Sequence, residues 1–353
     1  MSANLEFLAG RYAYDSIRRD GFSPSRIGAL AGASGGAKWL VLSQIDRVIL
    51  RELLPQLEAP VYTIGSSIGA WRFACYAQND PIAALDRFET GYLDQSYSEK
   101  PDRHEITRKS RDILEQLLGE NGSEQIVSNP VLRTSIMTVR ARHLTASEST
   151  PLLGAGLSLA MAANAIYRPL LGAFFERGLF YDPRDEAPWH DASGFPMQRI
   201  SLSEENVLDA VIASGAIPLV LSGVRNISGA RPGVYRDGGV IDYHFDVPLG
   251  VPGRITLFPH FFNWLKPGWF DKRLPWRRIN ERYFSSTVVV CPSPAFIAQL
   301  PGARVPDRKD FLRYPQDERV RIWREVVNRC EALAEELTQV LQGDQLPARL
   351  KRL

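Results

Sequence analysis

Cysteine is scarce in this sequence, and its placement argues against two classes of protein. The 353 residues include three cysteines, Cys75, Cys291 and Cys330, which stand far apart along the chain. An odd number with no C-x-x-C spacing fits neither a cysteine-ligated metal site nor a dense disulfide framework. We therefore expect three reduced, mostly buried thiols in a cytoplasmic protein.

A strong excess of charge of one sign is missing as well. The formal net charge is +2, and 44% of the residues are hydrophobic while 23% are charged. This balance is ordinary for a folded globular protein and too apolar for a disordered one. Because the net charge is so small, we expect no nucleic-acid partner.

The chain also lacks an uninterrupted apolar run of membrane-spanning length. Residues 1–22 have no basic start followed by an apolar stretch, so no secretory signal is predicted. Residues 152–175 come nearest to the roughly 20 apolar residues of a spanning helix. Asn164, Arg168 and Pro169 interrupt them, and proline disfavours a continuous helix. We interpret this segment as buried or lid-like helices.

What the sequence does contain is an alternation of strand and helix signals. Short apolar runs at residues 25–31 and 61–64 predict buried strands, each followed by a turn of small residues. Residues 39–54 carry apolar side chains at helical spacing, and Asp80-Pro81 is typical of a helix start. The alternation predicts an α/β fold. A further helix is predicted at residues 201–215, and further strands at residues 131–140, 235–241, 254–258 and 287–291.

The C-terminal part has one apolar stripe at helical spacing, from Trp323 to Leu341. Gly343 is placed to end that helix. We expect the helix to pack on the surface of the domain.

Residues 65–69 (GSSIG) fit the pattern G-x-S-x-G, which places a serine on a sharp turn between a strand and a helix. Small neighbours are needed because the turn lifts the hydroxyl clear of the sheet and aims the next helix's N-terminus at it. A buried strand precedes the pattern and a helical segment follows it, so Ser67 is a candidate nucleophile. A tight turn that uses small residues for geometry alone is the alternative. Residues 156–160 (GLSLA) are a near match inside an apolar helical stretch, and we interpret Ser158 as a packed small residue.

A glycine-rich turn, residues 32–38 (GASGGAK), follows the first predicted strand and opens a helix. It fits neither the phosphate-binding pattern G-x-x-x-x-G-K-[ST] nor the dinucleotide pattern G-x-G-x-x-G. We interpret the backbone amides of Gly35, Gly36 and Ala37 as donors for a developing oxyanion. A close strand–helix crossing that requires glycine is the alternative.

Residues 236–240 (RDGGV) put Asp237 directly before a pair of glycines, a pattern that is also typical of simple turns. A Ser-His-Asp hydrolase would need a histidine after the acid, and only His244 and His260 follow Asp237. Neither histidine lies in an obvious catalytic setting. A Ser67–Asp237 dyad and a triad that uses one of these histidines are both open from the residues alone.

Together, and in this order, the three motifs resemble those of the patatin-like phospholipase family. That family has a G-G-x-[RK] turn, a G-x-S-x-G elbow and a D-G-[GA] acid, which correspond to residues 35–38, 65–69 and 237–239. Residues 213–218 (ASGAIP) are similar to the family's small-residue segment ahead of the acid. Beside the dyad and the three oxyanion donors, the matching positions are Lys38, Gly65, Gly69, Gly238 and Gly239.

The resemblance implies a three-layer α/β/α sandwich with a mostly parallel central sheet. It also implies hydrolysis of acyl esters by the Ser67–Asp237 dyad, with no metal or other cofactor. We expect residues 1–250 to form the acyl hydrolase core and residues 251–353 to complete the same domain. Two positions depart from the family pattern: Trp39 stands where the turn has a glycine, and Tyr243 where an asparagine is expected.

Aromatic and basic side chains alternate in residues 257–284. This mixture suits a lipid interface, where rings lie at headgroup depth; the alternative is an irregular segment folded over the core with its charges in water. The expected partner is a lipid or another acyl ester, with peripheral membrane contact through residues 257–284 as a hypothesis. A catalytically silent lipid-binding or scaffold protein with the same fold is an alternative of a different class.

Overall fold

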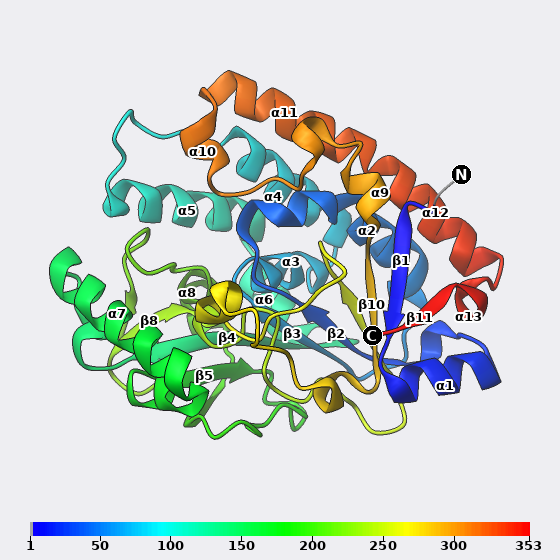
Figure 1. Cartoon of the computed structure of the whole chain (residues 1–353), viewed down its shortest axis with the longest axis horizontal. Helices are drawn as coiled ribbons and strands as arrows, with labels where there is room; N and C mark the ends of the chain where they lie inside the picture. Colours follow the sequence, from blue (N-terminus) through cyan, green and yellow to red (C-terminus); the bar gives the residue numbers. More distant parts are fainter. Residues whose placement is uncertain (1–2) are drawn as a thin grey trace.

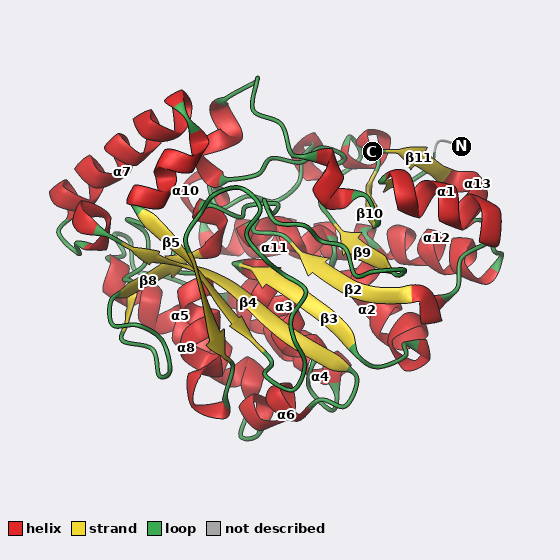
Figure 2. Cartoon of the chain, turned by 90° about the horizontal axis from the view of Figure 1, so that it is seen from below, coloured by secondary structure: helices red, strands yellow, loops and turns green. Residues whose placement is uncertain are grey.

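A computed structural model describes residues 3–353 as one 11-stranded sheet with helices around it (Figures 1 and 2). The strands are β1 (Leu5–Ala9), β2 (Ile27–Gly32), β3 (Val61–Ser66), β4 (Leu132–Ala141), β5 (Phe175–Tyr181), β6 (Met197–Ser201), β7 (Val224–Arg225), β8 (Val234–Asp237), β9 (Ile255–Pro259), β10 (Thr287–Pro292) and β11 (Leu350–Arg352).

The middle of the sheet is parallel. The strand order is β11-β1-β10-β9-β2-β3-β4-β5-β6, with β8 paired to β4 and β7 paired to β8. The consecutive pairs from β10 through β9, β2 and β3 to β4 are all parallel, whereas β1 with β10, β4 with β5 and β4 with β8 are antiparallel. Every residue of β2, β9 and β10 is buried, as expected for parallel strands covered on both faces.

Helices flank this sheet, and Figure 2 shows them around the parallel strands. Helix α3 packs on β2 and β3, α8 on β4 and β8, and α1 on β1 and β10. The predicted α/β class with a mostly parallel central sheet is confirmed. The helices are α1 (Arg11–Asp20), α2 (Ser43–Val48), α3 (Ile68–Tyr76), α4 (Pro81–Asp94), α5 (Arg103–Leu118), α6 (Gly122–Ser128), α7 (Thr150–Ile166), α8 (Glu204–Ser214), α9 (Pro294–Ile297), α10 (Asp310–Arg313), α11 (Gln316–Arg329), α12 (Glu331–Gln342) and α13 (Leu346–Arg349).

The C-terminal part of the chain contributes to the same sheet. Strand β9 lies between β2 and β10, and β11 pairs with β1 at the edge. The residues after 250 therefore share a sheet with the N-terminal strands, while the division at residue 250 itself stays a prediction.

The apolar stripe near the C-terminus forms two helices rather than the single predicted one. The side chains of Trp323, Cys330 and Leu333 on this stripe are fully buried. The helix breaks at Cys330, where ψ is −5° and the N–H lies 3.1 Å from the carbonyl oxygens of both Val326 and Val327. This tighter turn separates α11 from α12, and Gly343 ends α12 as predicted.

Residues 152–175 are interrupted as predicted, but the helix is buried on only one side. Helix α7 ends at Ile166, and a 3₁₀ turn with Pro169 in its first turn follows. Leu153, Leu157 and Ala160 are buried, whereas the opposite face of α7 is exposed. Within residues 3–353, none of the helices combines the length and the apolarity that crossing a membrane requires.

Candidate active site

Ser67 lies at the turn between β3 and α3, where the G-x-S-x-G pattern predicts it. Its backbone has φ 55° and ψ −125°, and a positive φ is uncommon for a residue with a side chain. Helix α3 crosses β2 so closely that a Cβ atom on Gly69 would lie 1.9 Å from the carbonyl oxygen of Gly32. A Cβ atom on Gly65 would lie 2.5 Å from Cα of Ala70. The elbow therefore has room only for glycine at both of its flanks.

Asp237 ends strand β8 and faces the elbow. The hydroxyl of Ser67 donates a hydrogen bond to its Oδ2 at 2.7 Å. Its Oδ1 accepts the backbone N–H of Gly239 at 2.7 Å, within the 3₁₀ turn that Gly238 begins. The structure thus brings together two predicted site residues that are 170 positions apart in the chain.

Both side chains are nearly closed off from water. The exposed fraction is 5% for Ser67 and 6% for Asp237. Burial of the carboxyl group raises the pKa of Asp237 to about 6, although the hydrogen bonds from Ser67 and Gly239 act in the opposite direction. Because an ordinary aspartate has a pKa of about 3.9, Asp237 is the stronger base and is still mainly ionised at neutral pH.

Hydrogen bonds of three further serines fix the position of the elbow. None of the three was predicted as a site residue. The N–H of Ser67 donates to Oγ of Ser214 at 2.8 Å, and that hydroxyl donates to the carbonyl oxygen of Met137 at 2.7 Å. The hydroxyl of Ser34 donates to that of Ser66 at 3.0 Å, which ties the glycine-rich turn to the elbow. Ser214 lies in the segment ASGAIP and carried a sequence signal, whereas nothing in the sequence pointed to the Ser34–Ser66 contact.

The glycine-rich turn leaves β2 beside the elbow and enters a 3₁₀ turn over Gly36–Val41. Gly36 has φ 55°, in the left-handed region that favours glycine. Within residues 3–353, the N–H groups of Gly35 and Gly36 donate to no protein acceptor. Ala37 follows in the first helical turn, where N–H groups lack intrahelical partners. The turn therefore offers free amide donors next to Ser67, as an anion-binding turn must.

Comparison with protein families places these features in one family. The family model described as patatin-like phospholipase matches residues 32–245, which include the glycine-rich turn, the elbow and Asp237. The chain belongs to the patatin-like phospholipase family.

Solved structures that resemble this patatin-like chain are distant in sequence. Human GIVD cytosolic phospholipase A2 is 11% identical with a TM-score of 0.39, and the alignment covers 96% of this chain and 63% of that structure. VipD from Legionella pneumophila is 12% identical with a TM-score of 0.32, and the alignment covers 68% of this chain and 51% of that structure. The chain thus spans between half and two thirds of the length of these structures. No curated protein sequence matches it.

The two residues at the end of the patatin-like turn anchor it to two different parts of the chain. Lys38, the basic residue of the motif, forms an ion pair with Asp307, which lies outside the family match. Trp39, which departs from the family pattern, is fully buried and stacks on Phe88 of α4 with ring centroids 4.4 Å apart. The side chain of Trp39, which stands where the family has glycine, therefore packs the turn against α4.

Tyr243, the second departure, also supports the turn. Its carbonyl oxygen accepts the N–H of Ser34 at 2.9 Å, and its ring is nearly buried. The ammonium group of Lys272 lies 3.6 Å from the centroid of that ring. The segment that contains Lys272 thereby reaches the neighbourhood of Asp237, whose pKa its positive charge lowers slightly against the larger effect of burial.

The two histidines of the triad alternative are not part of this arrangement. His244 and His260 are fully buried with ring centroids 4.3 Å apart, and within residues 3–353 neither makes a hydrogen bond to the dyad residues. Nδ1 of His244 accepts the N–H of Lys266 at 3.0 Å. Burial lowers the pKa of both rings, that of His260 to about 3, so that both are neutral.

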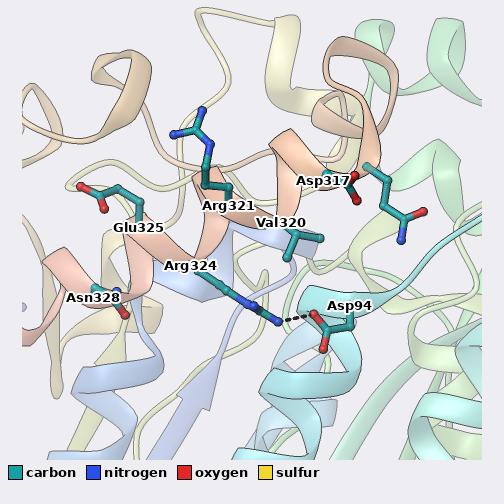
Figure 3. Close-up of a pocket in the computed structure, with 8 residues that line it drawn as sticks. Asp94, Asp317, Val320, Arg321, Arg324, Glu325 and Asn328 are labelled. Carbon is teal, nitrogen blue, oxygen red and sulfur yellow. Dashed lines mark hydrogen bonds and ion pairs between the residues drawn. The ribbon is translucent and has the colours of Figure 1, made fainter.

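A separate depression on the surface involves none of these residues. It lies along α11 at the end of α4, and the ion pair between Arg324 and Asp94 at 2.7 Å crosses it (Figure 3). Its lining is mostly charged and polar, and includes Asp317, Arg321 and Glu325. Such a lining does not suit an acyl chain, and we assign the depression no role in the site.

Proposed function

We propose that this chain hydrolyses acyl esters of lipids, with Ser67 as nucleophile and Asp237 as general base. The observation that carries the proposal is the 2.7 Å hydrogen bond from the Ser67 hydroxyl to the Asp237 carboxylate at a strained elbow. Membership of the patatin-like phospholipase family supports a lipid ester as the substrate class. The proposed reaction uses water and no cofactor.

In the proposed first step, Asp237 takes the hydroxyl proton of Ser67 while Oγ attacks the ester carbonyl carbon. The negative charge moves to the carbonyl oxygen, which the amides of Gly35, Gly36 and Ala37 stabilise. The tetrahedral intermediate then collapses, and the leaving alcohol receives the proton from Asp237. Water hydrolyses the acyl-enzyme in the same way, and the proton that Asp237 takes from water returns to Oγ.

The raised pKa of Asp237 supports its role as the base without a histidine. Only the ionised carboxylate accepts the proton, so kcat/KM is expected to rise with pH and reach half its maximum near the pKa of about 6. Asp237 cannot be assigned as the base if the pH–rate profile is flat through this region.

The proposal includes a cytoplasmic protein with peripheral membrane contact through residues 257–284. All three thiols are free and buried, which supports a reducing compartment. Trp276 and Trp264 expose 65% and 47% of their surface, while Phe258 and Phe261 of the same segment are buried. The exposed tryptophans are thus available to a lipid surface, and the buried phenylalanines anchor the segment to the core.

The test is hydrolysis of a short-chain chromogenic ester and of micellar lysophospholipid by four proteins. Ser67→Ala and Asp237→Asn are each expected to lower kcat/KM by about 10⁴-fold or more, as in hydrolases with a comparable nucleophile and base. Ser158→Ala is the matched control, because Ser158 is an exposed serine inside α7 and should leave the rate unchanged. Circular dichroism checks that each variant is folded.

Three results would overturn the proposal. Full activity in Ser67→Ala would exclude the dyad, and loss of activity on replacing His244 or His260 in a protein that stays folded would favour the triad. A folded wild-type protein without turnover on either substrate would favour a silent lipid-binding protein.

A further inference from the structure

Helix α7 exposes an apolar face that carries no charge. Residues 150–167 contain no aspartate, glutamate, lysine, arginine or histidine. Large apolar side chains on this helix and just beyond it expose between 44% and 82% of their surface: Leu152, Leu159, Met161, Ile166, Tyr167 and Leu170. We call Leu152, Leu159, Met161 and Ile166 the α7 surface. Figure 1 shows α7 at the periphery of the molecule, beyond β5.

The opposite side of α7 is apolar too. Leu153, Leu157 and Ala160 pack in one hydrophobic cluster with Val240, Ile241 and Phe270. A helix that is apolar on all sides is normally covered on all sides. Exposure of a patch of this size in water indicates a surface that another apolar body covers.

Unpaired cations lie on a segment that is attached to α7. The basic segment, residues 272–278, is attached to the helix because Arg277 donates to the carbonyl oxygen of Asn164 at 2.6 Å. In that segment Arg273 and Arg278 are exposed and form no ion pair with any residue of 3–353. Trp276 projects from the same segment. An apolar helix with free cations and an exposed tryptophan on an attached segment has the composition of an interfacial membrane anchor.

We propose that the α7 surface and the basic segment together dock this protein onto anionic lipid membranes. The choice of a lipid as the occupant rests on the proposed function, since a lipid hydrolase must meet its substrate at an interface. Charge supports the choice, because anionic headgroups would neutralise the free cations. In a symmetric contact between two copies of the chain, the patch would face an identical patch, which has no acidic side chains to pair with the free cations.

The buried side of α7 packs beside the candidate active site. The residues that α7 covers, Val240 and Ile241, directly follow the Asp237-Gly238-Gly239 turn. The ammonium group of Lys272 in the basic segment lies 3.6 Å from the ring of Tyr243. A membrane bound to this surface would therefore contact the helix that packs against the segment directly after Asp237.

The experiment measures vesicle binding, with the full chain carrying Ser67→Ala so that hydrolysis cannot alter the vesicles. Co-sedimentation with phosphatidylcholine–phosphatidylserine vesicles gives the partition coefficient. Leu159→Glu and Ile166→Glu are each expected to lower it at least about tenfold, because each removes the burial of one large apolar side chain. Arg273→Ala and Arg278→Ala should each lower it about fivefold, and only at low ionic strength.

Matched controls lie on α1, at the opposite end of the molecule from α7 in Figures 1 and 2. Tyr12 is an exposed aromatic residue and Arg11 an exposed arginine without an ion pair among residues 3–353. Tyr12→Glu and Arg11→Ala should leave the partition coefficient unchanged. Melting temperatures verify that each variant is folded.

The outcomes separate this proposal from the proposed function. Vesicle binding that is unaffected by the α7 variants, or equally affected by the α1 variants, overturns the docking surface whatever the esterase assay shows. Light scattering that finds a dimer, converted to a monomer by Leu159→Glu in a protein that binds no vesicles, identifies a second copy as the occupant. Loss of binding in the α7 variants alone supports docking even if no ester is hydrolysed.

Discussion

Two segments of this chain share a glycine and a serine at the spacing of the G-x-S-x-G pattern but have different structures. Residues 65–69 (GSSIG) form the elbow between β3 and α3, whereas residues 156–160 (GLSLA) lie inside α7. Ser67 is buried with a positive φ and donates to Asp237, while Ser158 is exposed and donates to the carbonyl oxygen of Gly154 at 2.9 Å. The difference teaches that the five-residue pattern alone does not identify a nucleophile. A serine becomes a candidate only where a strand precedes it and a helix that crosses the sheet follows it.

The two segments also differ in how they affect the stability of the fold. The elbow combines a strained backbone at Ser67, a contact with no space at Gly69 and a carboxylate removed from water at Asp237. Strain and desolvation of this kind lower stability and are concentrated at functional sites. In α7 the space depends on the position: a Cβ atom on Gly156 would lie 2.9 Å from the backbone carbonyl carbon of Leu144, whereas nothing lies within 4 Å of a Cβ atom built on Gly154, two residues before the compared segment. The comparison therefore predicts opposite responses to the same substitution in the two places.

Gly69→Ala is expected to have the largest effect on stability. The added Cβ would lie 1.9 Å from the carbonyl oxygen of Gly32, and both atoms belong to elements of the buried core. Relief requires α3 to move away from β2, so we expect a loss of about 3 kcal/mol or more in the free energy of unfolding, at the upper end of overpacking effects. Urea denaturation measures the change. A loss below about 1 kcal/mol would show that the helix moves easily and that the elbow is not sterically fixed.

Asp237→Asn is expected to stabilise the fold at neutral pH, although the proposed mechanism predicts that it abolishes hydrolysis. The pKa is about 6 in the folded chain and about 3.9 in an unfolded one, so the folded state binds more protons between these values. Stability from this group is thus present below pH 4 and is lost as the pH rises to 6. Removing the charge should add up to about 3 kcal/mol at pH 7 and almost nothing at pH 4.

Chemical denaturation of wild type and variant at both pH values measures this difference. If the variant and the wild type have the same free energy of unfolding at pH 7 as well as at pH 4, Asp237 is not desolvated. That result would also remove the reason given for its strength as a base.

The sequence could predict those parts of the site in which the local backbone conformation allows only certain residue types. The steric need for glycine at residues 65 and 69 is visible in the sequence because the strand and the helix around them are contiguous. The same holds for the turn before α4, where Asp80 caps the helix through the N–H of Ala83 at 2.9 Å. The partnership of Ser67 with Asp237 came from the family resemblance, since the chain alone left a triad open.

Contacts between distant segments could not be predicted in this way. The hydrogen bond of 3.0 Å between the hydroxyls of Ser34 and Ser66 depends on the loop after β2 meeting the end of β3, and no spacing in the sequence encodes that contact. The pairing of Lys38 with Asp307 likewise depends on how the C-terminal segment folds over the turn. The exposed face of α7 could not be predicted, because a helix that is apolar all round has the same composition whether one of its sides or all of them are buried.

Gly154→Ala gives the smallest effect and tests the comparison in the opposite direction. Gly154 lies inside α7 with open space around its Cα, so a methyl group meets no neighbour. Alanine reduces the conformational freedom of the unfolded chain and suits the helix better, which should add about 0.5–1 kcal/mol to the free energy of unfolding. Thermal and urea denaturation of this variant and of Gly69→Ala, run side by side, measure the expected gain and the expected loss in the free energy of unfolding. If Gly154→Ala destabilises the protein instead, a neighbour must cover that part of α7 in solution, and the contrast between a crowded elbow and an open helix no longer holds.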